Sequence, residues 1–237
     1  MTTALAAASA LVAVAFAFST YERWLLRRSP QYFAWTVALA LFVVGASALA
    51  WGSSVGWSPL AFRIFYATGA VANVPVLAAG QMYLLVTRKT ADRIAQVLGL
   101  VLAFTVGVVM TDPLTASVPA DRLPKGGEVF HAWPRVFAAV GSGVGATVLV
   151  VGTVLGVVRI ARANRYAQVS GARLRMTGLG LLALGTIVLG LSGLFNSVLN
   201  AMAAFSVTLM LGVTILFAGF VLSTTGPVGA KTPVKTR

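Results

Sequence analysis

Four polar side chains within one apolar stretch are the residues best placed to bind a solute. They are Arg63, Tyr66, Asn73 and Gln81. At 100° per helical residue they fall within about 80° of one another, and the first and last would lie about 27 Å apart, close to the thickness of a bilayer core. On a lipid-facing surface their amide and guanidinium groups would be unsatisfied, so the stripe should face the interior of a helix bundle.

These four side chains have two interpretations. In the first they hydrogen-bond a small neutral or weakly polar solute, assisted by the carbonyl of Val71, which Pro75 frees because its ring removes that helical hydrogen bond and kinks the helix. In the second Asn73 and Gln81 are hydrogen-bond contacts between helices, and Arg63 is an anchor that reaches the membrane surface.

A second set of polar groups belongs to a long, proline-containing connection at residues 111–133. Asp112, Glu128 and His131 are its candidates for a lid or a docking element, although the connection could also be an ordinary interfacial loop. Arg63 could pair with Asp112 or Glu128. Two more amides, Asn196 and Asn200, end the sixth apolar segment on the same predicted side and complete the candidate solute-binding set.

The predicted spans lack the side chains that most catalysis needs. None contains Asp, Glu, His or Cys, so we expect no general base, covalent nucleophile, metal site, cofactor or catalytic residue there. A lone histidine, His131, is poor evidence for a metal. The same composition argues against proton-coupled transport, which needs a titratable group at membrane depth. An enzyme acting within or at the membrane is therefore a third hypothesis.

Seven apolar segments must position these residues, and each is near the ~20 residues that a bilayer requires. We predict an all-α, polytopic membrane domain over residues 1–222, followed by a basic tail at 223–237. A composition of 58% hydrophobic and 10% charged residues, with a mean hydropathy of +0.90, excludes a soluble globule. The predicted transmembrane helices cover about residues 3–20, 32–51, 60–86, 94–110, 134–158, 176–195 and 201–222.

The distribution of positive charge predicts the orientation. Of the 18 Lys and Arg residues, all but Arg63, Arg122, Lys125 and Arg135 fall on one predicted side. Because basic loops stay cytoplasmic, the N-terminus should be outside and the C-terminus inside, in a bacterial cytoplasmic membrane. The net charge of +13 then faces anionic lipid head groups, and nucleic acid is not an expected partner.

Small residues predict close helix packing. Gly141, Gly145, Gly152 and Gly156 form one continuous face of the fifth segment. Such faces let helix backbones approach closely in lipid, either inside the bundle or between subunits of a homo-oligomer.

The helix count also allows a parallel repeat of three, one and three helices. Without a gap, the second and third segments align on the sixth and seventh, which pairs Gly45 with Gly185 and Ala61 with Ala201.

The chain resembles a family of uncharacterised seven-helix membrane proteins of actinobacterial type. The similarity runs through residues 61–66 (AFRIFY), 123–130 (LPKGGEVF) and 193–197 (GLFNS), and it implies no particular activity. Similarity to SWEET and PQ-loop proteins is limited to helix count and orientation. An opsin is disfavoured because the seventh segment has no lysine for a retinal Schiff base.

Two non-enzymatic functions follow from the sequence. In one the protein binds, or passively passes, a small neutral solute or lipid along the polar stripe of the third helix. In the other it is a scaffold or accessory subunit that holds a membrane-protein partner through its glycine faces and outer loop.

Overall fold

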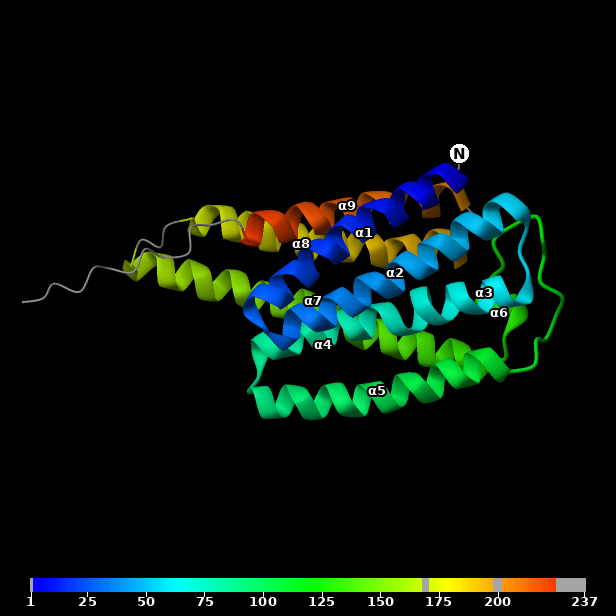
Figure 1. The fold of residues 1–237 in the computed structure, drawn as a ribbon, viewed down its shortest axis with the longest axis horizontal. Helices are drawn as coiled ribbons and strands as arrows, with labels where there is room; N and C mark the ends of the chain where they lie inside the picture. Colours follow the sequence, from blue (N-terminus) through cyan, green and yellow to red (C-terminus); the bar gives the residue numbers. More distant parts are fainter. Residues whose placement is uncertain (1, 168–170, 198–201, 225–237) are drawn as a thin grey trace, which may run out of the picture.

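The computed structural model describes residues 2–167, 171–197 and 202–224, where every regular element is helical and seven helices are long and apolar enough to cross a membrane. This confirms the predicted all-helical bundle (Figure 1). The third span is built from three consecutive pieces, and α6 is a single turn in the long connection. The elements are α1 Thr2–Arg27, α2 Pro30–Val55, α3 Pro59–Phe65, η1 Tyr66–Ala72, α4 Asn73–Leu85, α5 Arg88–Thr111, α6 Gly126–Val129, α7 Ala132–Ala167, α8 Ala172–Ser197 and α9 Met202–Thr224.

Several helices extend beyond the predicted spans. α1 continues to Arg27, well past the predicted end near residue 20, and α5 begins at Arg88, before the predicted start near residue 94. The predictions stopped where charged residues begin, whereas backbone hydrogen bonding continues outside the apolar layer.

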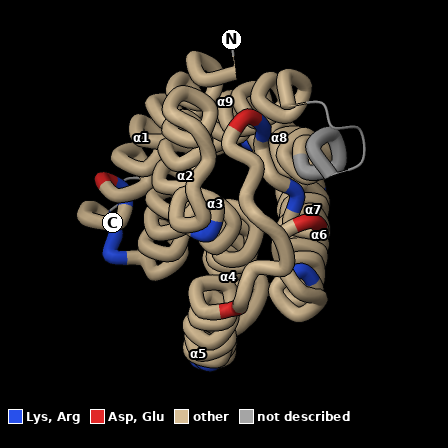
Figure 2. Tube along the Cα trace, turned by 90° about the vertical axis from the view of Figure 1, so that its right-hand side faces the viewer, with Lys and Arg blue, Asp and Glu red and all other residues tan. Residues whose placement is uncertain are grey.

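Of the seven described spans, six form a closed ring and α5 lies outside it. The third span takes part in the ring mainly through α4. Around the ring α1 contacts α2, α2 contacts α4, and α4 contacts α7; α8 and α9 follow, and α9 returns to α1. Figure 2, which looks along the bundle, shows this ring with α5 projecting beyond it next to α4. The ring places one face of each of its helices around a common interior.

The two ends of the bundle differ in charge. One end, here called the loop end, holds the start of α1 and residues 112–131 (Figure 1). The opposite end, called the basic end, holds the turn between α1 and α2 with Arg27 and Arg28, and the start of α5 with Arg88 and Lys89.

The long connection folds onto the helix ends at the loop end. Its two arms are joined to each other where the Thr115 N–H donates to the carbonyl of Val129 at 2.9 Å. The connection is joined to the turn between α2 and α3 where the Trp57 N–H donates to the carbonyl of Ala120 at 3.1 Å. Phe130 is 2% exposed, and its ring centroid lies 5.4 Å from that of Phe62 in a stacked arrangement. The connection is therefore anchored by an aromatic side chain inserted between helices.

The third span contains a π-helix immediately before Asn73. The Asn73 N–H donates to the carbonyl of Thr68, five residues earlier, which places one extra residue in that turn. Pro75 lies just beyond, and its ring prevents an ordinary α-helical bond to the carbonyl of Val71. The neighbouring carbonyl of Ala70 accepts a hydrogen bond from Ser142 Oγ of α7 at 2.7 Å, so a helix contact satisfies the backbone at this point.

The four glycines predicted to pack together lie at contacts inside the bundle. A Cβ added to Gly141 would touch Pro75 at 3.4 Å, one at Gly145 would lie 3.0 Å from Val74, and one at Gly152 would lie 2.5 Å from Gln81 Nε2. All three face α4. Gly156 faces α8 instead, with Leu179 Cδ1 at 3.2 Å.

Helices α8 and α9 approach each other more closely than side chains on both would permit. A Cβ added to Gly185 would lie 2.9 Å from the backbone nitrogen of Leu216 and 3.0 Å from the carbonyl oxygen of Gly212. Because these are backbone atoms, they can move away only if the helices separate. Gly180 on α8 has no such neighbour within 4 Å.

We predict that Gly185→Ala destabilises the bundle by about 1–3 kcal/mol, because the added methyl group forces α8 away from α9. Gly180→Ala is the matched control and should be neutral or stabilise by up to about 1 kcal/mol, through the higher helix propensity of alanine. Thermal unfolding of both variants in the same detergent checks this. Equal unfolding midpoints would contradict the close contact.

Candidate functional site

The four stripe residues of the third span do not point in one direction. Tyr66, Asn73 and Gln81 line interior cavities, whereas Arg63 points outward to α5. The sequence prediction assumed 100° per residue throughout, but η1 lies between Arg63 and Asn73 and changes the rotation of the chain there. The prediction that all four side chains form one continuous interior stripe is therefore wrong for Arg63.

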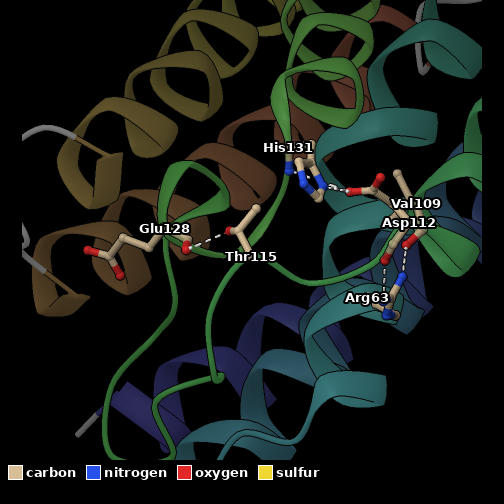
Figure 3. Close-up of polar contacts among 6 residues, drawn as sticks. All are labelled: Arg63, Val109, Asp112, Thr115, Glu128 and His131. Atoms are coloured by element: carbon tan, nitrogen blue, oxygen red, sulfur yellow. Dashed lines mark hydrogen bonds and ion pairs between the residues drawn. The ribbon is translucent and has the colours of Figure 1, made fainter.

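Arg63 caps the last turn of α5. Its guanidinium donates to the carbonyl of Val109 through Nη1 and to the carbonyl of Asp112 through Nη2 at 2.6 Å (Figure 3). A cation at this end of a helix satisfies carbonyls that lack helical partners and interacts favourably with the helix dipole. Its Cζ also lies 5.8 Å from the ring centroid of Phe130. Arg63 thus ties α5 to the ring and to the connection.

The candidate lid residues separate into two clusters. Asp112 bonds Arg63 through its backbone carbonyl, and its carboxylate Oδ2 lies 3.1 Å from His131 Nδ1 (Figure 3). Glu128 is not part of this group, because its Oε2 lies 3.0 Å from Arg122 Nη1 and the side chain points away from His131. The carboxylates therefore pair with His131 and Arg122, not with Arg63 as the sequence suggested.

Two cavities occupy the interior of the ring. The loop-end cavity has a volume of about 420 Å³, and Pro124 and Gly126 of the connection line it next to Tyr66. The basic-end cavity has a volume of about 400 Å³ and reaches Arg159 and Arg175. Both volumes fall in the range of ordinary small-molecule sites.

The two cavities are adjacent, and the side chains that line both of them are here called the neck. Seven side chains line both of them, and five of the seven are apolar. The neck residues are Phe42, Asn73, Leu77, Leu149, Thr186, Leu189 and Leu216. Taken together, the cavities and the neck extend from the connection at the loop end to the arginines at the basic end.

Asn73 is the main polar group of the neck. The residue is 7% exposed, and its Nδ2 donates to the carbonyl of Ala38 on α2 at 2.9 Å. In the described part of the chain its side chain makes no other hydrogen bond, which leaves Oδ1 as an acceptor at a residue that lines both cavities. Asn73 therefore serves both interpretations, since it joins two helices and also lines the neck.

Gln81 lines the basic-end cavity, farther from the neck than Asn73, and it packs against α7. The missing side chain of Gly152 makes room for it, because a Cβ there would overlap its amide. Of the remaining candidates, Asn196 belongs to α8, but its side chain is not among those that the structure describes. Asn200 lies outside the described residues. The predicted cluster of Arg63, Asn196 and Asn200 consequently stays a prediction.

Sequence reasoning missed several cavity residues. Arg159 and Arg175 had been interpreted only as orientation signals, yet both line the basic-end cavity. Gln31 at the start of α2 and Thr186 at the neck were also missed. A single polar residue on an apolar helix gives no signal of which neighbours it will face, so these residues could be found only once the ring was known.

Among residues 2–167, 171–197 and 202–224, no three His, Cys, Asp or Glu side chains lie close enough together to hold a metal ion. In comparisons with protein-family models, curated proteins and solved structures, nothing matches this chain. The resemblance noted at residues 61–66, 123–130 and 193–197 therefore stays a prediction.

We predict that Arg63→Leu lowers the free energy of unfolding by about 1.5–3 kcal/mol, because the carbonyls of Val109 and Asp112 lose a charged donor. Arg122→Gln is the control. It removes an equal charge from the loop end, but the Arg122–Glu128 pair is exposed and should contribute about 0–1 kcal/mol. Thermal unfolding in detergent compares the two. If Arg122→Gln were as destabilising as Arg63→Leu, the cap on α5 would not be the cause.

Proposed function

We propose that this protein binds, and passively passes, a small neutral or weakly polar solute through the interior of its helix ring. The observation that carries the proposal is the pair of adjacent cavities whose linings share the neck residues, Asn73 among them. We place it in a bacterial cytoplasmic membrane with the loop end outside, because the basic residues gather at the opposite end and basic loops stay cytoplasmic.

The chemistry of the neck favours a neutral solute. Among its described side chains, Asn73 and Thr186 are the polar ones and none is titratable, so an ion or a proton would find no compensating charge there. A mainly apolar neck would also exclude water when no solute occupies it, which is how hydrophobic constrictions act as gates. The neck would accordingly serve as both barrier and selectivity element.

The order of helices around the ring supports the proposed parallel repeat. α1, α2 and the third span are followed around the ring by α7, α8 and α9, so the two sets occupy the ring in the same order. Gly45 on α2 and its aligned partner Gly185 on α8 both lie at close contacts with the next helix, Gly45 against Thr68 and Gly185 against Leu216. We propose that the two halves share one ancestral three-helix plan, with α5 as the connecting helix.

We predict that Gly69→Phe blocks solute flux. Gly69 lines the loop-end cavity and has no atom within 4 Å of an added Cβ, so a phenyl group can enter the cavity without displacing a helix. Gly143→Phe is the control, because Gly143 also has open space but lines neither cavity. Osmotic swelling of proteoliposomes with glycerol and urea measures flux. We expect the rate of empty liposomes for Gly69→Phe and the wild-type rate for Gly143→Phe.

We further predict that Asn73→Leu abolishes flux while the protein still folds. The substitution keeps the size of the side chain but removes the acceptor at the neck and the donor to Ala38. Loss of one buried hydrogen bond should cost about 1 kcal/mol, too little to unfold the bundle. The same swelling assay, with gel filtration as the folding check, tests it; unchanged flux would count against a solute path through the neck.

A scaffold function is the second candidate, with α5 as the helix that would meet a partner. α5 lies outside the ring, and large apolar side chains on it are exposed, including Val97 at 62%, Leu100 at 75% and Phe104 at 63%. A partner helix could pack there without disturbing the cavities. Purification from native membranes in mild detergent should then recover a stoichiometric partner, and Leu100→Trp should release it.

A further inference from the structure

Two arginines stand at the mouth of the basic-end cavity. Arg159 projects from α7 and Arg175 from α8, and both line the cavity. Arg159 Nη1 also donates to the carbonyl of Leu84 at 3.4 Å, which holds its guanidinium across the gap between α7 and α4. The mouth is thus bordered by two positive charges from adjacent helices.

None of the acidic side chains lines the cavity behind this mouth. The acidic residues of the whole chain are Glu22, Asp92, Asp112, Asp121 and Glu128. All five are described, and none lines either cavity. At the basic end Glu22 is exposed on α1, while Asp92 accepts from Tyr83 at 2.9 Å and pairs with Arg88 at 3.9 Å.

Other arginines at this end have different surroundings. The Cζ of Arg23 lies 5.3 Å from the ring centroid of Phe220, and that of Arg28 lies 5.2 Å from the Trp24 ring. Arg162 and Arg173 are exposed and line neither cavity. Arg159 and Arg175 are distinguished by their position at the entrance to an interior space, which a signal for orientation alone would not require.

Behind the arginines the cavity is lined mainly by apolar and aromatic side chains, among them Phe16, Trp35, Leu39, Leu182 and Val213. Its volume of about 400 Å³ would hold roughly 13 groups of the size of a water molecule or a methylene, at ~30 Å³ each. It combines a cationic mouth with a long apolar interior, whose far end is the neck at Asn73.

We infer that the basic-end cavity binds a single-chain anionic amphiphile. Its carboxylate or phosphate head would accept hydrogen bonds from Arg159 and Arg175, because guanidinium groups match both anions with two parallel donors. Its chain would run between the aromatic side chains toward Asn73. The surrounding apolar walls lower the local dielectric and strengthen the attraction to the head group. This site rests on the basic-end cavity used in the proposed function, but binding there needs no flux through the neck.

Equilibrium binding to the full-length protein in nanodiscs of phosphatidylcholine tests the inference, with empty nanodiscs as the blank. The probes are decanoate and decyl phosphate, which supply the two anionic heads, and decanol, which supplies the chain without charge. Acetate and inorganic phosphate supply the heads without a chain. We expect saturable binding of decanoate or decyl phosphate, at least about tenfold tighter than that of decanol, and no competition from acetate or phosphate.

Two pairs of substitutions separate the site from surface charge. Arg159→Gln with Arg175→Gln should weaken decanoate binding about tenfold or more, whereas Arg162→Gln with Arg173→Gln removes the same charge from the same end and should change it little. Arg159→Lys with Arg175→Lys keeps the charge without the planar fork and should bind with intermediate affinity, which guards against a folding defect.

Three results would overturn the inference: decanol bound as tightly as decanoate, equal losses in the Arg159/Arg175 and Arg162/Arg173 pairs, or displacement of decanoate by inorganic phosphate alone. The outcome is independent of the flux assay. Saturable decanoate binding together with no flux of glycerol or urea would reject the proposed function and support this site. Flux without decanoate binding would do the opposite.

Discussion

Hydrocarbon offers no hydrogen-bond partner, so a polar group inside this bundle is stabilised only when it finds one in the protein or in a cavity. The third span depends on this constraint most. Arg63 donates to carbonyls of α5, Asn73 donates to α2, and the carbonyl of Ala70 in the π-helix accepts from Ser142 of α7. These contacts run in three directions, which makes the third span the element that joins the others. Polar side chains that would be liabilities on a lipid surface here specify which helices are neighbours.

The ring of helices that these hydrogen bonds hold together encloses an interior space. Glycines bring α7 against α4 and α8 against α9, but no helix crosses the centre, so side chains alone fill it and leave room at both ends. The two cavities differ at their outer ends: Pro124 and Gly126 of the connection line one, while Arg159 and Arg175 line the other. An interior of this kind can accept different groups from its two ends while presenting a single neck between them.

Helix number and class could be predicted from the sequence because they depend on composition and length, which each segment carries by itself. The close contacts of Gly141, Gly145 and Gly152 with one neighbour follow from their spacing on α7, although the partner helix could not be known in advance. The direction of Arg63 could not be predicted, since one wide turn in η1 changes the rotation of the chain between it and Asn73. The position of Arg159 and Arg175 in a cavity lining could not be predicted either. A basic residue near the end of an apolar segment gives the same sequence pattern whether its side chain faces lipid or an interior space.

α5 touches the ring only from outside, yet it determines how the ring is assembled. α1 and α7 both begin at the loop end, and they can do so only because an even number of spans, four with α5 included, precedes the second set of helices. Without α5, α7 would start at the basic end, and α7, α8 and α9 would each run in the opposite direction. The arginines of α7 and α8 would then lie at the loop end, and the positive charge would no longer distinguish the two faces of the membrane. α5 lines neither cavity, yet its presence determines the direction in which α7, α8 and α9 run.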